Sequence, residues 1–246
     1  MADESKGTKI SRRKFVKNSG YVAGGVVGGG LIGSLLGVNF GGTEQTSTAP
    51  AQETKFNQAL MYFTRQADFN TLGAATERIF PTDDNGPGAL ELGVPYFIDH
   101  QLAGAYGNND NEYMQGPFYT GTPFQGYQSA LKRHEIFMQG IRALDRESEA
   151  NFNDSFTNLE EEQQDEILQS FEADEVELKG VTSSEFFEML RTATLAGAYS
   201  DPLYGGNDDM EGWKMKEYPG SQMSYINEIE DDDFKEIEPS ALNEHL

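Results

Sequence analysis

The spacing of apolar residues after Phe56 most constrains the fold, because apolar side chains recur there at intervals of three and four residues. This spacing places them on one face of an α-helix, whereas a half-buried strand needs alternating apolar and polar residues. No convincing alternating run rich in Val, Ile or Thr follows Phe56. The pattern predicts an all-α, single, irregular helical domain whose helices are joined by long loops rich in Gly, Pro and Asn.

Stripes of apolar residues predict where the helices lie and which face of each is buried. Pro81 ends the first helix and Pro202 stops the last, because proline cannot continue a helix. The second helix runs to Gly104 or Gly107. The residues expected on the buried faces are, in chain order, Phe69, Leu72, Thr76 and Ile79; Val94, Phe97, Ile98 and Leu102; Tyr127, Leu131, His134, Met138, Ile141 and Leu144; Leu159, Ile167, Leu168 and Phe171; and Phe186, Phe187, Leu190 and Leu195.

Capping residues predict where the later helices begin. The dipeptide at 122–123, Thr-Pro, is typical of an N-cap followed by a first-turn proline, so a long helix should start there. Thr157 with Glu160 has the spacing of a capping box, and Thr182 with Glu185 repeats it. These pairs are expected to open the last two helices.

Charge and cysteine content exclude several classes of function. The chain has 41 Asp and Glu against 18 Lys and Arg, a formal net charge of -23, and such a surface repels nucleic acid and anionic lipid. The charge serves either as a solubility device or as a field that steers a basic partner. Cysteine is absent, which excludes disulfides, thiolate nucleophiles, iron–sulfur clusters and covalent attachment of c-type haem.

The N-terminal region has the organisation of an export signal. Basic residues precede an uncharged, glycine-rich apolar run at 21–40. Within the basic part, residues 11–17 (SRRKFVK) resemble the twin-arginine signal, which directs folded proteins to the twin-arginine translocon. We therefore expect the chain to be exported across the cytoplasmic membrane, to the periplasm or the outer face of the membrane. The candidate export-signal residues are Arg12, Arg13 and Phe15.

The same glycine-rich run contains Gly28, Gly30 and Gly33, spaced as in the dinucleotide-binding fingerprint. That fingerprint needs a strand before it, a helix after it and an acidic residue about 20 positions further on, within a βαβ unit. An export signal and a polar linker occupy these positions instead. The glycines are therefore not interpreted as a nucleotide site.

These features divide the chain into three parts. Residues 1–51 form the signal and a polar linker, residues 52–225 the helical domain, and residues 226–246 an acidic tail expected to be a solvated end. The small-x-small sequence at 49–51 is suitable for signal cleavage. A permanent anchor is the alternative, although the glycines make the run less apolar than a stable spanning helix requires.

Few residues suggest chemistry of the chain's own. The runs at 83–85 and 207–209 carry oxygen ligands suitable for calcium, but lack EF-hand spacing, and turn formation is the alternative reading. Among the histidines only His100 is a candidate catalytic base, and a neutral structural histidine is the alternative. We predict no catalytic, cofactor-binding or metal site in this chain.

Loops rich in Gly, Pro, Asn and aromatic residues, at 81–88, 106–113 and 201–220, are expected to serve recognition. Trp213 is the only tryptophan and lies in the last of them. Its ring either pins its own loop or anchors an interface with a partner. The candidate partner-interface residues are Tyr204, Asn207, Trp213 and Tyr218.

Several separated segments together resemble one family, the small subunit (subunit 3, or gamma) of membrane-bound gluconate 2-dehydrogenase and related sugar dehydrogenases. The segments lie, in order, at 77–88, 93–104, 139–145, 200–207, 212–214 and 218–220. The resemblance implies an FAD-dependent large subunit of the glucose-methanol-choline type that oxidises the sugar or sugar acid. It also implies a cytochrome c subunit that passes the electrons to the respiratory chain.

The resemblance assigns no catalytic residue to the small subunit. It implies an accessory protein that supports the flavoprotein and co-exports it through the twin-arginine pathway, with FAD in the large subunit and haem c in the cytochrome partner. The alternative is an independent exported ligand-binding protein or enzyme that is not tied to a flavoprotein.

Overall fold

The computed structural model describes residues 58–119, 121–122, 124–226, 229 and 235–245. The predicted signal and linker, with Arg12, Arg13 and Phe15, lie outside these residues. The described residues contain helices and no strand, so the all-α prediction is confirmed for them. The long helices are α2 (Gln66–Ile79), α3 (Val94–Ala103), α5 (Arg133–Phe152), α6 (Glu161–Glu172) and α7 (Ser183–Ala198). The short ones are α4 (Ala105–Asn108), η2 (Phe156–Asn158), η3 (Pro202–Tyr204), η4 (Asp208–Met210), α8 (Glu211–Lys214) and η5 (Leu242–His245).

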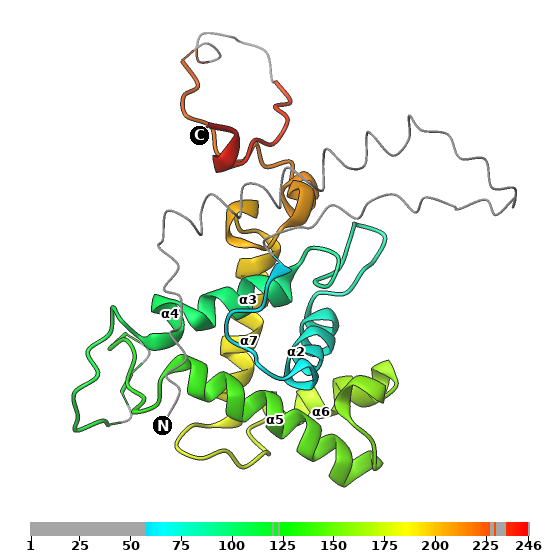
Figure 1. Ribbon diagram of the computed structural model, residues 1–246, viewed down its shortest axis with the longest axis vertical. Coiled ribbons are helices and arrows are strands. Elements are labelled where there is room, and N and C mark those ends of the chain that lie inside the picture. Colours follow the sequence, from blue (N-terminus) through cyan, green and yellow to red (C-terminus); the bar gives the residue numbers. More distant parts are fainter. Residues whose placement is uncertain (1–57, 120, 123, 227–228, 230–234, 246) are drawn as a thin grey trace, which may run out of the picture. The chain divides into compact units, whose positions relative to one another are not determined.

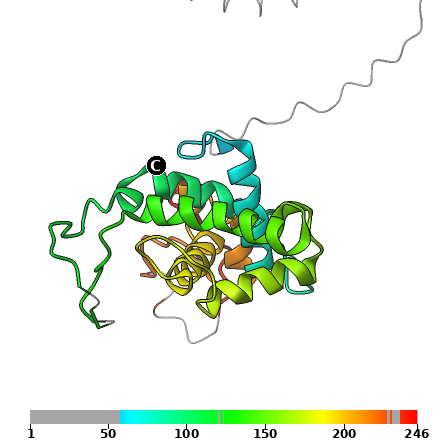
Figure 2. The same cartoon turned by 90° about the horizontal axis from the view of Figure 1, so that it is seen from below.

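Helix α7 contacts each of the other long helices and lies between α3 and α5 (Figure 1). Figure 2 shows the same packing from below. The α7 side chain at the centre of this packing is Phe186. Its ring meets Phe137 of α5 and Phe171 of α6 edge to face, with ring centroids 6.0 and 5.7 Å apart. All three rings are fully buried. Such pairs add to the stability gained from apolar burial alone.

Gly140 allows α5 to approach Phe186. A methyl group at Gly140 would lie 2.2 Å from two ring carbons of Phe186, closer than any real contact. The position therefore needs glycine even though glycine lowers intrinsic helix stability. None of the helices in the described ranges is long and apolar enough to cross a bilayer.

The stripes on α2, α3 and α7 predict burial well. Phe69 and Leu72 of α2, and Ile98 and Leu102 of α3, are buried as expected. The cap of α7 is also confirmed, because Thr182 Oγ1 accepts a hydrogen bond from the Glu185 N–H at 3.1 Å. Leu195 was predicted to be buried and is exposed, since it faces away from the core side of α7.

The predicted start of the long helix at 122–123 is wrong. Helix α5 begins at Arg133, and the described residues from 124 to 132 form turns and extended chain. The Arg133 N–H donates to the buried Asn109 side chain at 3.0 Å, and the Lys132 N–H donates to Glu135 at 2.8 Å. A contact 24 residues away in sequence therefore satisfies the first turn of the helix.

The predicted capping role of Thr157 is also wrong. Thr157 lies in η2, and α6 begins one residue after Glu160, whose N–H donates to the Gln163 side chain at 3.1 Å. The buried Phe156 ties this turn to both α5 and α6. Its N–H donates to the Asp145 carboxylate at 3.2 Å, and its carbonyl accepts from Gln164 at 2.8 Å.

Replacing Gly140 with Ala tests the close packing of α5 on α7. We expect the free energy of unfolding to fall by about 1 to 3 kcal/mol, because overpacking against Phe186 outweighs the helix-propensity gain from Ala. Urea denaturation would measure the loss. Asn151→Ala, at an exposed position of the same helix, should be neutral or slightly stabilising. Equal stability of Gly140→Ala and the wild type would contradict the packing argument.

Candidate partner-binding site

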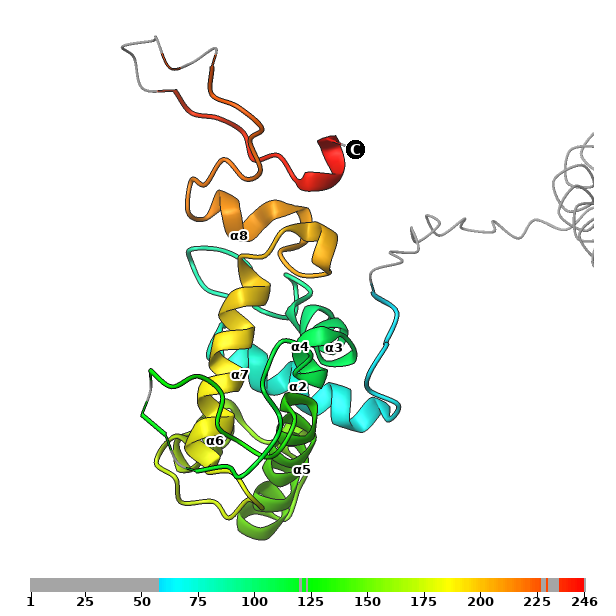
Figure 3. The same ribbon diagram turned by 90° about the vertical axis from the view of Figure 1, so that its left-hand side faces the viewer.

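Two of the predicted recognition loops lie side by side, the one that follows α2 and the one that follows α7. The Asp208 N–H donates to the Leu92 carbonyl at 3.1 Å, and the rings of Phe80 and Tyr199 meet edge to face with centroids 5.8 Å apart. Figure 3 shows α8 beyond the C-terminal end of α7, next to this junction. The third loop, at 106–113, leads instead to the start of α5 and is tied to it through Asn109.

Glu77, the last acidic residue of α2, organises the loop that follows that helix. Its carboxylate accepts from the Thr82 N–H at 3.1 Å and from the Leu90 N–H at 2.9 Å. Thr82 Oγ1 in turn accepts from the Gly88 N–H at 2.9 Å. A methyl group at Gly88 would lie 2.5 Å from the Thr82 backbone nitrogen as well as 2.3 Å from a Glu77 oxygen, so the loop needs glycine at this point. The Glu77 carboxylate therefore stabilises the shape of its own chain.

The acidic run within that loop forms a turn. Asp83 accepts from the Asn85 backbone N–H at 2.7 Å and from the Asn85 side-chain amide at 2.9 Å. These hydrogen bonds to the charged form lower the pKa of Asp83. Within the described part of the chain, His, Asp and Glu side chains nowhere gather into a group that could hold a metal ion. Asp83 therefore has the contacts expected of a turn residue, which was the alternative to a calcium ligand.

Asp201 and Asn207 organise the second loop. The Asp201 carboxylate accepts from the Leu203 N–H at 2.9 Å and so caps η3. Asn207 is fully buried, donates to the Ser200 carbonyl at 2.8 Å and accepts from the Gly212 N–H at 2.7 Å. Asn207 therefore closes the loop from inside and offers no side-chain surface to a partner.

Trp213 is held by its own loop. Its side chain is only 6% exposed, its Nε1–H donates to the Tyr199 carbonyl at 2.9 Å, and its ring meets Tyr218 edge to face. A ring so deeply buried has little area left for a partner to cover. The interface prediction stays a prediction, and of its residues Tyr204 and Tyr218 are half-exposed, as is the neighbouring Leu203.

The end of the chain packs on this same loop. The Ser221 N–H donates to the Ser240 carbonyl at 2.7 Å, and the Leu242 N–H donates to the second oxygen of Asp201 at 2.9 Å. Ala241 between them is 3% exposed. The expectation of a solvated tail is therefore wrong for these residues, because Asp201 and a small side chain give them a docking position that composition does not reveal.

Residues before α2 are fixed to α3 by Asp99. This buried carboxylate accepts from the N–H groups of Met61, Tyr62 and Phe63, at 2.5, 3.1 and 2.8 Å. Its neighbour His100 has Nε2 2.8 Å from the Ala59 carbonyl, an arrangement in which the ring nitrogen must donate. His100 thus has the contacts of a structural histidine. The role of Asp99 was not predicted from the sequence, although its position one helical turn before the buried Leu102 could have indicated it.

The comparison with known families decides the assignment. Residues 66–220 match the family model described as Gluconate 2-dehydrogenase subunit 3, which is more than half of the chain. The chain belongs to that family. The resemblance seen in the separated segments is thereby confirmed. No curated protein and no solved structure matches the chain.

The family match begins at the first residue of α2 and ends at Gly220. Both organised loops of this subunit lie inside it, together with Asp99 and the close-packed Gly140. The segment at 59–63 and the docked tail lie outside it. As a member of this family the chain is consistent with an accessory subunit, and the family implies a complex with other subunits.

Trp213→Ala should separate loop stability from partner binding. We expect it to destabilise the isolated chain by about 3 to 5 kcal/mol, because it removes a buried ring and its hydrogen bond. Tyr204→Ala removes a half-exposed ring, so it should change stability by no more than about 0.5 kcal/mol. It should instead weaken the complex if this loop is an interface. Thermal melting of the free chain and a binding titration would measure the two effects. An unchanged melting temperature for Trp213→Ala would show that the ring does not support the loop.

Proposed function

We propose that this chain is a non-catalytic subunit that binds the FAD-containing, glucose-methanol-choline type subunit of a gluconate 2-dehydrogenase-like complex, stabilises it and accompanies it out of the cytoplasm. Family membership gives the class of complex. The contacts of Glu77, Asp99, Asp201 and Asn207 support the non-catalytic role. These four side chains lie in the segments that resemble the family. Each accepts hydrogen bonds from backbone N–H groups of the chain itself.

This use of polar side chains is the observation that carries the proposal. A general base or nucleophile must be within reach of a substrate and have a free lone pair to react. The carboxylates named above instead accept hydrogen bonds from loop N–H groups, so their oxygens are engaged by the chain's own backbone. Their arrangement gives the subunit rigid loops, and rigid loops are suited to contact with another folded protein.

Export supports the same assignment from the sequence. A flavoprotein acquires FAD as it folds, so a flavoprotein without its own signal needs a signal-bearing partner and a translocon that accepts folded cargo. Arg12, Arg13 and Phe15 would supply that signal. The complex would then act in the periplasm or on the outer face of the membrane, where an uncleaved signal would keep it attached.

Electron transfer would involve the other subunits. The flavin of the large subunit would oxidise a sugar or sugar acid, and a cytochrome c subunit would pass the electrons to the respiratory chain. The present chain has no cysteine to attach haem c covalently. Its proposed part in the reaction is structural.

The isolated subunit should be colourless. We expect a visible spectrum without flavin or haem bands after gel filtration of the purified chain, because FAD and haem c are assigned to its partners. Protein absorbance from the aromatic residues is the internal reference. A flavin band that stays with this chain alone would contradict the non-catalytic role and favour an independent enzyme.

Replacing Arg12 and Arg13 together with Lys should retain both this subunit and the flavoprotein in the cytoplasm. The positive charge is kept, but an ammonium group cannot reproduce the planar, forked hydrogen bonding of a guanidinium. Cell fractionation and a dye-linked assay of sugar oxidation outside the membrane would measure export. Lys6→Arg with Lys9→Arg is the matched control, since it changes nearby basic residues without touching the pair. Full external activity in the double-lysine variant would remove the escort role.

A further inference from the structure

A long uncharged loop precedes α5. Residues 113–131 contain no Asp, Glu, Lys, Arg or His, although 24% of the chain is charged and its net charge is -23. Tyrosine, phenylalanine, glutamine and glycine dominate the loop. The buried centre of a protein interface is depleted in charge and enriched in Tyr, Phe and Met. The loop has this composition within a chain that is otherwise strongly acidic.

The start of α5 fixes the loop at its base. The Arg133 guanidinium lies between the rings of Tyr106 and Tyr127, 4.8 and 4.6 Å from their centroids. Its terminal nitrogen also pairs with Glu112 at 2.7 Å. Asn109 accepts from the Arg133 backbone N–H and joins the same cluster. The stacked arginine therefore holds both sides of the loop, and the described residues between these sides project from a fixed base.

Aromatic rings on this loop lie in solvent. Phe124 is 96% exposed, Tyr113 78% and Tyr119 72%, and they are the most exposed aromatic side chains among the described residues. Single exposed apolar side chains are common, but a group of aromatic rings on one pinned loop is typical of an interaction surface. Covering these rings would release the water that hydrates them and so favour binding.

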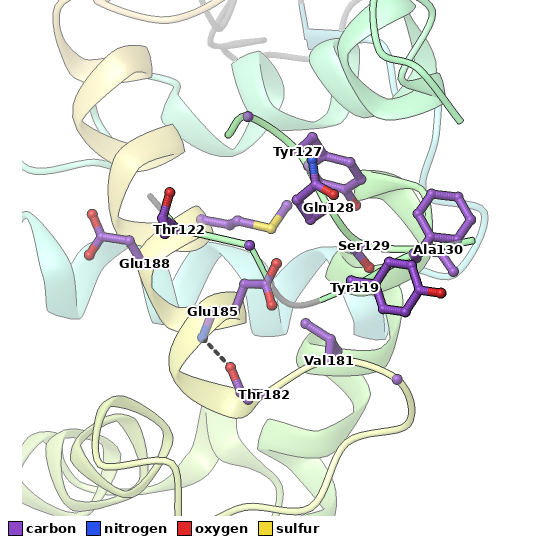
Figure 4. A pocket seen from close by; sticks show the side chains of 15 residues that line it. Tyr119, Thr122, Tyr127, Gln128, Ser129, Ala130, Val181, Thr182, Glu185 and Glu188 are labelled. Atoms are coloured by element: carbon purple, nitrogen blue, oxygen red, sulfur yellow. Dashed lines mark hydrogen bonds between the residues drawn. The ribbon is translucent and has the colours of Figure 1, made fainter. Parts of the chain in front are cut away.

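A groove of about 1010 Å³ lies between this loop and the beginning of α7 (Figure 4). Tyr119, Tyr127 and Met189 give it apolar walls, and Glu185 points from α7 toward the loop. Partial burial raises the pKa of the Glu185 carboxyl, and none of the ion pairs between described residues includes it. Since the Glu185 residue is exposed, a cationic group of a partner placed in the groove could reach its carboxylate and pair with it.

A stable complex needs more contact area than the loop after α7 offers. Two folded proteins that associate stably bury about 800 Å² on each partner, from roughly 20 to 30 residues. The exposed side chains of the loop after α7, Leu203, Tyr204 and Tyr218, are too few to supply it. A second copy of this chain is disfavoured as the occupant, because two chains of net charge -23 repel each other.

We infer that the described residues of this loop, 113–119, 121–122 and 124–131, form with the groove beside α7 a second docking surface for the dehydrogenase subunit. Its occupant is a segment of that subunit in which apolar side chains flank a Lys or Arg. The apolar side chains cover Tyr119 and Phe124, and the cation pairs with Glu185. The inference rests on the proposed function, since it assigns a further surface to the same partner.

The test is a titration of the full chain with the purified FAD-containing subunit. Binding is measured as the flavin absorbance that elutes together with the present chain. Tyr119→Ser combined with Phe124→Ser should raise Kd by about tenfold or more, because well-packed aromatic side chains dominate interface energies. Met223→Ser combined with Ile226→Ser is the matched control, since it removes exposed apolar side chains outside the loop and should leave Kd nearly unchanged. Glu185→Gln should weaken binding at low salt and reduce its salt dependence.

The outcomes separate this inference from the function on which it rests. If the wild-type chain does not bind the flavoprotein, the proposed function fails and the inference fails with it. If the wild type binds and the loop variant binds equally well, only the inference is overturned. A dimer of this chain that the loop variant dissociates, or binding to phosphatidylcholine vesicles that the variant abolishes, would also overturn it. Should the double variant melt at a lower temperature, Phe124→Ser alone makes the same test, because its ring packs against almost nothing.

Discussion

Hydrogen bonds from loop N–H groups to a few side-chain acceptors are the interaction on which the rest of this structure depends. An irregular loop satisfies only some of its own backbone donors, and a donor that is buried without a partner costs about 1 to 3 kcal/mol. Glu77, Asp99, Asp201 and Asn207 supply the missing acceptors. Because each carboxylate serves two or three donors, a single side chain fixes several residues of loop. The long loops are therefore ordered parts of the fold, and they can present side chains at fixed positions.

Three arginine side chains of the acidic chain join elements that are distant in sequence. Arg78 of α2 forms a forked pair with Asp165 of α6, both contacts at 2.9 Å, which raises the pKa of the guanidinium. Arg142 of α5 pairs with the buried Asp68 of α2 at 3.1 Å. Arg133 holds the uncharged loop. A planar guanidinium can form several directed hydrogen bonds at once, which suits it to such joints better than an ammonium.

The sequence predicts the parts of this fold that depend on local pattern. The stripes on α2 and α3 and the cap of α7 are correct because helix periodicity and an N-cap threonine act within a few residues. The start of α5 was missed because it depends on Asn109 and on the stacking of Arg133, which are contacts between distant residues. The same limit applies to the site. The composition of its loops was visible in the sequence, but the burial of Asn207 and Trp213 was set by packing that no local pattern encodes.

Two segments outside the family match dock on residues inside it through contacts of the same kind. Residues 61–63 bind Asp99, and Leu242 binds Asp201, in each case through backbone N–H groups. Every residue except proline carries such a donor, so these hydrogen bonds by themselves require no particular side chain in the docking segment. The acceptors, in contrast, must be carboxylates at fixed positions of α3 and of the loop after α7, and both lie within residues 66–220. The acceptor side of these contacts therefore depends on particular side chains, while the docking segments contribute backbone donors together with the buried side chains of Phe63 and Ala241.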